Sequence, residues 1–176
     1  ACFTNDDELA AKLRAIKNHG GVKRFHHKYI GLNARLDTVQ ASILLKKLDY
    51  FDDTIKQRNQ CATYYTEKLQ SLTKHGFTFP SIKSEYTSVW AQYSILAKNK
   101  EIRDSVVAYL KQNNINVAIF YPAPLHKQEC FKPYIDITNL PVTDSICDRV
   151  FNLPCYGELS KLEQDYIIDK LLLFDN

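Results

Sequence analysis

Residues 30–44 read Ile-Gly-Leu-Asn-Ala-Arg-Leu-Asp-Thr-Val-Gln-Ala-Ser-Ile-Leu, and they join a basic loop to a long helical pattern. Gly31 can adopt the positive φ of a sharp reversal, and Asn33 tolerates the same region. Asp37, with a glutamine three residues later, is typical of a capping box. Asn33 and Arg35 should therefore lie just before a helix N-terminus, whose free N–H groups favour anions. Spacing alone favours a plainer interpretation, in which Asn33 closes a turn and Arg35 is a surface cation.

The loop before this stretch, residues 22–29, reads Val-Lys-Arg-Phe-His-His-Lys-Tyr and concentrates cations, imidazoles and aromatic rings. Such a loop could bind a diphosphate, but a cationic surface loop often binds nothing, and the residues alone leave both interpretations open. His26 and His27 have no cysteine or carboxylate at metal-ligand spacing, so we expect no metal site here.

The composition is that of a globular chain, since 45% of the 176 residues are apolar and can bury a core. Lysine and arginine number 23 against 20 acidic residues, and the net charge of +3 is too balanced to indicate a nucleic-acid partner. The sequence contains no apolar run of the ~20 residues that a membrane span needs and no signal-peptide pattern. We therefore expect a cytoplasmic protein with no membrane contact.

The five cysteines, at positions 2, 61, 130, 147 and 155, are scattered without a CxxC pair or zinc spacing, so we expect reduced and mostly buried thiols. The absence of methionine and the strand-like opening suggest that the chain begins in mid-protein. The sequence contains no Gly-x-Ser-x-Gly elbow, paired catalytic carboxylates or glycine-rich phosphate loop. The residues alone therefore show no catalytic chemistry.

Hydrophobic periodicity predicts the elements of the N-terminal part. Residues 1–4 should form a short strand, followed by a helix that Asn5 caps. Leu9, Leu13 and Ile16 recur at helical spacing and should be buried along one face. The glycines that follow are typical of a helix end.

The pattern from residue 38 is helical for about 35 residues, with a break expected near Asp49 and Tyr50. It divides the chain into residues 1–36 (strand, helix and basic loop), 37–75 (long connecting helices) and 76–176 (a small α+β domain). In the last part we expect strands at 89–96, 115–121 and 151–154 and helices at 102–110, 144–150 and 159–173.

Short motifs along the whole chain occur in an order that resembles the sugar-nucleotide aminotransferases. These motifs are ACFTNDDELA at 1–10, FHH at 25–27, the stretch at 30–44, KL at 47–48, AQY at 91–93, YPAPLHKQ at 121–128, LPV at 140–142 and LPCY at 153–156. That family comprises pyridoxal-phosphate enzymes of the aspartate-aminotransferase fold. The resemblance implies an α/β protein that forms the C-terminal part of a fold type I PLP-dependent transferase, with long helices leading into a small α+β domain.

The resemblance also implies what this chain does not carry. In the family, pyridoxal 5'-phosphate is bound mainly by the N-terminal half, and the lysine that holds it covalently lies upstream of the segment that matches Ala1. No residue of this chain is therefore assigned a catalytic role, and the isolated fragment should be inactive.

The resemblance assigns five binding residues. The family's Gly-x-Asn-x-Arg motif falls on Asn33, which would bind the phosphate of the cofactor in the partner subunit of a homodimer, and on Arg35, which would contact the partner's nucleotide-sugar. Tyr121 matches a tyrosine of the sugar site, and His126 lies in the same loop. His27 of the basic loop is placed on the substrate side. The active sites would thus be shared between subunits.

The subgroup that these motifs resemble aminates a UDP-linked 3-keto-uronic acid sugar with glutamate as amino donor, for bacterial O-antigen and lipopolysaccharide synthesis. Phe120 departs from the pattern, because those relatives carry histidine there, and we expect it on the side of a strand opposite Tyr121. Alternatives are an aminotransferase for neutral dTDP-linked keto-deoxysugars, a PLP-dependent sugar dehydratase, and a non-catalytic nucleotide-sugar-binding module.

Overall fold

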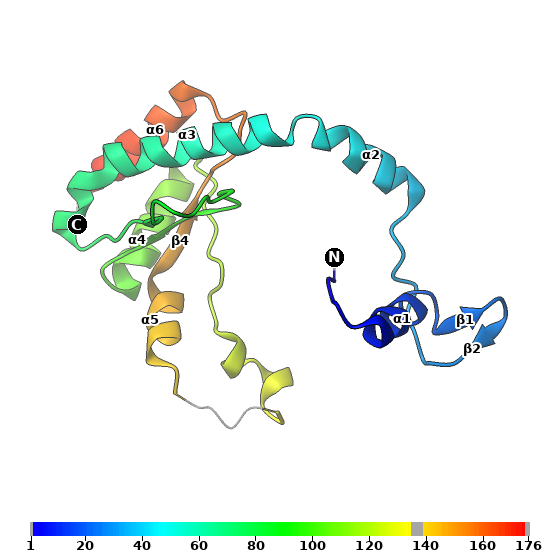
Figure 1. The fold of residues 1–176 in the computed structure, drawn as a ribbon. Coiled ribbons are helices and arrows are strands. Elements are labelled where there is room, and N and C mark those ends of the chain that lie inside the picture. The colour runs from blue at the N-terminus through cyan, green and yellow to red at the C-terminus, as the bar shows by residue number, and fades with distance from the viewer. Residues whose placement is uncertain (1, 135–138, 175–176) are drawn as a thin grey trace. The chain divides into compact units, whose positions relative to one another are not determined.

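The computed structural model describes residues 2–134 and 139–174. The chain forms two compact units, Ala1–Tyr50 and Phe51–Asn176, which we call the first and second units (Figure 1). Within the described ranges, no helix combines the length and the apolar character that crossing a membrane requires. The compact units divide inside the predicted segment 37–75, and the predicted three-part division stays a prediction.

The first unit contains two helices and a small hairpin. Helix α1 spans Asp7–Ile16, strand β1 Gly21–Lys23, strand β2 His26–His27, and helix α2 Thr38–Leu48. The two strands are antiparallel, with Gly21 opposite His27. The stretch after the hairpin then runs back along the end of α1, because Leu32 N donates to Ile16 O (2.8 Å) and Ala34 N donates to Lys17 O (2.9 Å).

Three expectations for the start of the chain are wrong. Residues 2–4 are not a strand, since no described segment pairs with them, and Phe3 is 94% exposed. The cap of α1 is Asp6 rather than Asn5, because the Asp6 carboxylate accepts from Leu9 N (3.0 Å). Leu9 is exposed, Leu13 and Ile16 are half-buried and Ala15 is buried, so the apolar face is only partly covered within the first unit.

Gly31 is required for space and not for its φ. The positive-φ residues of the described chain include Gly20 but neither Gly31 nor Asn33, so that expectation is wrong. A Cβ on Gly31 would lie 2.1 Å from Gly20 N and 2.6 Å from Ile16 O, which are backbone atoms that cannot swing away. The stretch therefore packs directly on the end of α1 because residue 31 has no side chain.

The predicted helix break at Asp49 and Tyr50 is confirmed. Helix α2 ends at Leu48 and helix α3 spans Phe51–Leu69, followed by the 3₁₀ helix η1 at Gln70–His75. Gly76 ends the run in the left-handed region at φ 86°.

The second unit is built around a two-stranded antiparallel sheet of β3 (Tyr93–Leu96) and β4 (Val150–Leu153), with Tyr93 opposite Leu153. Helix α4 spans Lys100–Gln112, helix α5 Pro141–Arg149 and helix α6 Lys161–Leu172; the short 3₁₀ helices are η2 (Leu125–Lys127) and η3 (Glu129–Phe131). Figure 1 shows α3 and α6 side by side, and their buried residues share one core with the sheet and α4.

Two predicted strands are shorter than expected. The strand expected at 89–96 is paired only from Tyr93 onward. The strand expected at 115–121 reduces to one bridge, in which Asn152 N donates to Ala118 O (2.8 Å) and Ala118 N donates to Asn152 O (3.3 Å). The prolines that follow Tyr121 lack backbone N–H donors, so a paired strand could not continue past residue 121.

Arg58 fastens α3 to the loops around the sheet. Its Nη1 donates to Trp90 O (2.9 Å) and to Cys155 O (3.1 Å). A guanidinium that bridges two carbonyls of distant segments satisfies backbone acceptors that the short sheet leaves unpaired.

Candidate functional site

Arg35 organises a small polar cluster at the end of α1, which we call the Arg35 corner and which consists of Asn18, Asn33 and Arg35. Arg35 Nε donates to Asn33 Oδ1 (3.2 Å) and Arg35 Nη1 donates to Asn18 Oδ1 (3.3 Å). Because a guanidinium can only donate, both amide oxygens must face it. Both amide NH₂ groups are therefore directed away from Arg35, and within residues 2–134 and 139–174 neither forms a hydrogen bond.

The backbone fixes this cluster as firmly as the side chains do. Asn18 and Asn33 are bridged antiparallel, and His19 N donates to Leu32 O (2.9 Å) on the same edge. Sequence reasoning identified Asn33 and Arg35 but missed Asn18, which lies 15 positions before Asn33. The sequence signal that could have identified Asn18 was the predicted end of the first helix there. After that end the chain reverses, and the stretch that contains Asn33 runs back beside it.

A cavity of about 550 Å³ lies beside the Arg35 corner and is open to the surface. The basic loop contributes His27, whose Nδ1 lies 2.9 Å from His19 O and must therefore carry the hydrogen of that bond. The lining is cationic and donor-rich, which suits an anion. It comprises Asn18, His19, Gly21, Val22, Lys23, Arg24, Phe25, His27 and Arg35.

The start of α2 contributes less to anion binding than its position suggests. Asp37 caps the helix by accepting from Val39 N (2.9 Å), so a carboxylate already occupies the helix end. An anion would meet that negative charge at the cap. The donors available to a ligand are therefore the side chains of the Arg35 corner and the basic loop.

The second unit carries the other predicted residues on an exposed loop. Tyr121 is 70% exposed, and its ring centroid lies 5.7 Å from that of Phe120. The expectation that Phe120 lies on the opposite side of a strand is wrong, because residues 120 and 121 are not in a strand and their rings are neighbours.

His126 lies against an acidic residue of α5. Its side chain is 5% exposed, and its Nε2 lies 3.4 Å from Asp144 Oδ1, while Lys127 Nζ lies 2.8 Å from the same oxygen. This cluster ties the loop after Tyr121 to the first turn of α5. The predicted contact of His126 with a substrate, like those of Asn33, Arg35, Tyr121 and His27, stays a prediction.

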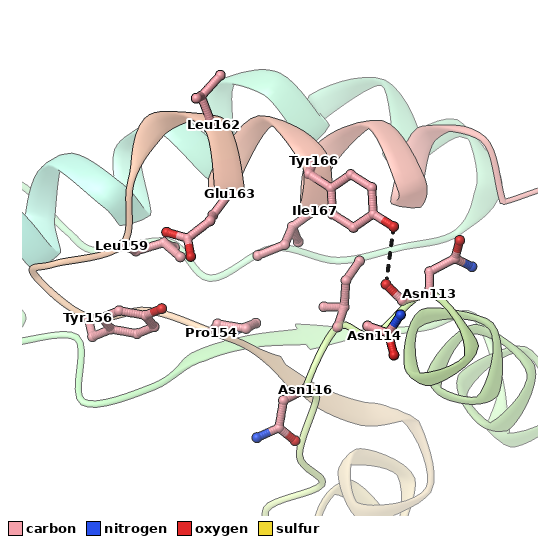
Figure 2. Close-up of a pocket in the computed structure, with 11 residues that line it drawn as sticks. Asn113, Asn114, Asn116, Pro154, Tyr156, Leu159, Leu162, Glu163, Tyr166 and Ile167 are labelled. Carbon is pink, nitrogen blue, oxygen red and sulfur yellow. Dashed lines mark hydrogen bonds between the residues drawn. The ribbon is translucent and has the colours of Figure 1, made fainter.

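A second cavity, of about 730 Å³, lies in the second unit between α6, the stretch after β4 and the residues after α4 (Figure 2). Tyr166 Oη donates to Asn113 O (3.1 Å) at one end. None of the predicted site residues lines it. Within the described ranges, no group of three or more histidine, cysteine, aspartate or glutamate side chains could hold a metal ion.

The fold is that of PLP-dependent aminotransferases. A DegT DnrJ EryC1 StrS aminotransferase from Brucella abortus superposes with a TM-score of 0.84 at 38% identity, covering 98% of this chain and 45% of that one. NtdA from Bacillus subtilis, whose structure contains the cofactor PMP, superposes with a TM-score of 0.81 at 25% identity, covering 96% and 40%. The predicted fold class is thereby confirmed.

The match to the model of the DegT/DnrJ/EryC1/StrS aminotransferase family extends over residues 1–172, and the chain belongs to this family. It is 41% identical to UDP-2-acetamido-2-deoxy-3-oxo-D-glucuronate aminotransferase from Pseudomonas aeruginosa over 90% of this chain and 42% of that protein. It is 32% identical to dTDP-3-amino-3,6-dideoxy-alpha-D-galactopyranose transaminase from Aneurinibacillus thermoaerophilus, over 96% and 45%. The chain thus spans less than half the length of these relatives.

Proposed function

We propose that this chain is the C-terminal portion of a PLP-dependent aminotransferase that moves an amino group from glutamate to the keto sugar of a nucleotide-sugar, for bacterial surface polysaccharide synthesis. The observation that carries the proposal is the Arg35 corner, in which one guanidinium turns two amide NH₂ groups outward beside a cationic cavity. Family membership supports the reaction class. The whole enzyme acts as a homodimer in the cytoplasm.

The Arg35 corner fits the phosphate of pyridoxal 5'-phosphate. Asn33 is exposed, its oxygen is held by Arg35, and its Nδ2 keeps two N–H donors for phosphate oxygens. In the dimer, Asn33 donates to the phosphate of the cofactor bound in the partner subunit. The bound cofactor supplies the carrier that accepts the amino group from glutamate and passes it to the sugar.

Arg35 and the basic loop bind the nucleotide-sugar. Arg35 offers a planar set of donors to a carboxylate or phosphate, and its bonds to Asn18 and Asn33 hold that plane in place before substrate arrives. His27 presents Nε2 while Nδ1 is engaged with His19 O. Pre-orientation reduces the loss of side-chain entropy on binding.

Tyr121 and His126 act at the sugar. Tyr121 is exposed and can stack on, or hydrogen-bond to, a pyranose ring. His126 lies against Asp144 with its side chain 5% exposed, so its part at the sugar is to hold in place the loop that carries Tyr121. These contacts orient the keto carbon towards the amino group.

The substrate class that we propose is a UDP-linked 3-keto sugar with a carboxylate at C6. The relative from Pseudomonas aeruginosa, whose name specifies a 3-oxo-D-glucuronate, supports the uronate. The relative from Acidithiobacillus ferrooxidans, named UDP-N-acetyl-3-dehydro-alpha-D-glucosamine 3-aminotranferase, is 35% identical and supports the UDP-linked 3-keto class. In either case Arg35 is the residue that meets the negative charge of the substrate.

One observation favours a second candidate, a neutral sugar. Phe120 is 43% exposed with its ring beside Tyr121, so an apolar surface adjoins the proposed sugar contact. A carboxylate next to that ring would be poorly solvated. The neutral alternatives are a UDP-linked 3-keto hexose and a dTDP-linked keto-6-deoxyhexose.

The test uses the full-length protein with glutamate as donor. It is assayed with a UDP-linked 3-keto-uronate, its neutral C6 counterpart and a dTDP-linked keto-6-deoxyhexose, and kcat/KM is compared. The proposal expects transfer to the uronate to be fastest. Faster transfer to either neutral sugar contradicts the uronate, loss of a hydroxyl instead of amino transfer indicates a sugar dehydratase, and binding without turnover indicates a non-catalytic module.

A further inference from the structure

The cavity of about 730 Å³ in the second unit is lined by negative charge without positive charge. Of the described residues that line it, none is a lysine, arginine or histidine, and Glu163 is the acidic one. Glu163 lies in the first turn of α6, and Figure 2 shows its side chain reaching from the helix towards Tyr156. The other lining residues are asparagines, tyrosines, aliphatic residues and a proline. The cavity should therefore attract cations and repel anions.

The carboxylate of Glu163 is fixed in place but keeps a free oxygen. Its Oε2 accepts from Ser160 N (2.9 Å) and from Ser160 Oγ (2.6 Å), and these bonds belong to the cap of α6. Within residues 2–134 and 139–174, its Oε1 accepts no hydrogen bond and no cationic side chain pairs with it. The bonds from Ser160 lower the pKa of Glu163, so the group is ionised at neutral pH. A negatively charged acceptor is thus in position before a ligand arrives.

Two tyrosines line the cavity, and they differ in what already contacts them. Tyr166 Oη donates to Asn113 O (3.1 Å), and Lys170 Nζ lies 5.4 Å from the centroid of the Tyr166 ring. Tyr156 is 39% exposed, and in the described part of the chain its ring has no aromatic or cationic partner. The open aromatic ring is therefore the one towards which the Glu163 side chain is directed (Figure 2).

The other lysine of α6 does not neutralise Glu163. Lys161 Nζ lies over the ring of Tyr64 on α3 and 4.0 Å from Asp165 Oδ1. Lys161 lines a different cavity, beside α3. The negative charge of Glu163 is therefore available to a ligand.

This combination of groups suits an organic cation. A positively charged nitrogen is attracted both to an aromatic face and to a carboxylate. A phosphate or carboxylate ligand would meet the charge of Glu163 without a cationic partner. A metal ion is disfavoured, because no cluster of three or more histidine, cysteine, aspartate or glutamate side chains lies within the described ranges. The apolar part of the lining suits the carbon atoms of a ligand.

We propose that this cavity binds a small organic ammonium ion, whose nitrogen lies between the Glu163 carboxylate and the Tyr156 ring. The carbon atoms of the ligand pack against Pro154 and Leu159, and the asparagine amides of the lining can bond to its hydroxyl groups. The site lies within the second unit and contains none of the residues assigned to the cofactor or the nucleotide-sugar. It is therefore independent of the proposed function.

The test uses the full-length protein with choline as the probe. The quaternary nitrogen of choline cannot form a Schiff base with pyridoxal phosphate, so covalent binding to the cofactor is avoided. The control ligand is its neutral isostere dimethylbutanol, in which a carbon atom replaces the nitrogen. Ligand-observed NMR titrations give the Kd of each. We expect saturable binding of choline and a Kd for the isostere that is higher by roughly tenfold or more.

Variants of the full-length protein locate the bound choline. Glu163→Gln keeps an oxygen that can accept from Ser160 N but removes the charge, and it should raise the Kd for choline roughly tenfold. Glu158→Gln removes the same charge from an exposed residue nearby that does not line the cavity, and it should leave the Kd unchanged. Tyr156→Leu should raise the Kd, whereas Tyr156→Phe should not, because phenylalanine keeps the ring face.

Circular dichroism verifies that each variant is folded, and if Tyr156→Leu is not, the comparison of Glu163→Gln with Glu158→Gln decides the question. Absence of saturable choline binding would overturn the proposal. Equal binding of choline and its neutral isostere would also overturn it, because the cavity would then select for shape and not for charge. A Kd that Glu163→Gln leaves unchanged would place the bound choline elsewhere and contradict the assignment.

Discussion

Arg35 acts on its neighbours by being unable to accept a hydrogen bond. Its two donated bonds determine which atom of Asn33 and of Asn18 faces inward, and so leave donors and not acceptors at the surface. A lysine at position 35 could place a charge there but could not bridge two amides in one plane. The chemistry of the corner therefore depends on the guanidinium and not only on its charge.

Substitutions in the full-length protein should separate the role of Asn33 from that of Arg35. We expect Asn33→Ala to weaken retention of the cofactor and Arg35→Ala to raise the KM for the nucleotide-sugar, each by roughly 1–3 kcal/mol for a charge-assisted hydrogen bond. Cofactor retention is measured by dialysis and absorbance, and KM by initial rates.

Arg35→Lys is the matched control for charge. Arg35→Lys should show a smaller rise in KM than Arg35→Ala, because lysine keeps the positive charge but not the planar set of guanidinium donors. Full recovery by lysine would show that Arg35 acts as a point charge, and an unchanged KM in Arg35→Ala would remove it from the substrate site.

Gly31 gives a second prediction at this scale. Gly31→Ala should lower the free energy of unfolding by about 1–3 kcal/mol, because the new Cβ meets backbone atoms of Gly20 and Ile16. Gly157→Ala is the matched control, since the added Cβ there first meets the end of the flexible Gln57 side chain. Urea unfolding of both variants measures the difference, and equal losses would contradict the explanation from close packing.

Among the elements, α6 has the most complete cap, because Ser160 Oγ accepts from Glu163 N (3.2 Å) and the Glu163 carboxylate accepts from Ser160 N (2.9 Å). The hydrogen bonds from the hydroxyl and backbone of Ser160 lower the pKa of Glu163 below its ordinary 4.5. A carboxylate with a lowered folded pKa adds stability that is complete above the unfolded pKa and lost as the pH falls through the folded pKa.

This cap should therefore make the stability of the protein depend on pH in the acidic range. Thermal unfolding of the wild type and Glu163→Gln is compared at several pH values. The Tm of the wild type should be higher than that of the variant at neutral pH, and this difference in Tm should narrow as the pH falls below about 4.5. A difference that stays constant down to strongly acidic pH would mean that the charge of Glu163 contributes nothing to the cap.

The helices could be predicted from sequence more reliably than the strands, for a physical reason. A helix completes its hydrogen bonds within one segment, so the break at Asp49 and Tyr50 and the end at Gly76 follow from local signals. A strand needs a partner, and neither residues 2–4 nor most of 115–121 find one in the described chain. Periodicity records the preference of a segment but not the presence of its partner.

The site was predictable only in part for a related reason. Asn33 and Arg35 stand in one motif, but Asn18 joins them through tertiary structure, and no local pattern links the three residues. The sequence pattern singled out Gly31 for a positive φ, whereas the structure requires glycine there because of close packing against backbone atoms. Those backbone neighbours cannot be identified from the sequence. The resemblance to a family supplied the roles that spacing could not.

At the scale of the whole molecule, the chain spans less than half of its relatives, and the proposed chemistry depends on the rest of the enzyme. We propose, from the family resemblance, that the lysine that holds the cofactor lies upstream of the segment that matches Ala1, and we therefore expect the isolated chain to be unable to transfer amino groups. Pyridoxal phosphate and borohydride should leave its lysines labelled weakly and without preference. Stoichiometric labelling of a single lysine would contradict this assignment.

The central claim is that Arg35 serves an active site whose lysine belongs to the partner subunit. The decisive measurement mixes two full-length variants, Arg35→Ala and a variant whose cofactor-binding lysine is replaced, and isolates the mixed dimer by differential tags. If the site is shared, one of its two sites combines an intact lysine with an intact Arg35, and the mixed dimer should show about half the wild-type activity although each parent dimer is impaired. A mixed dimer no more active than the average of its parents would contradict the account.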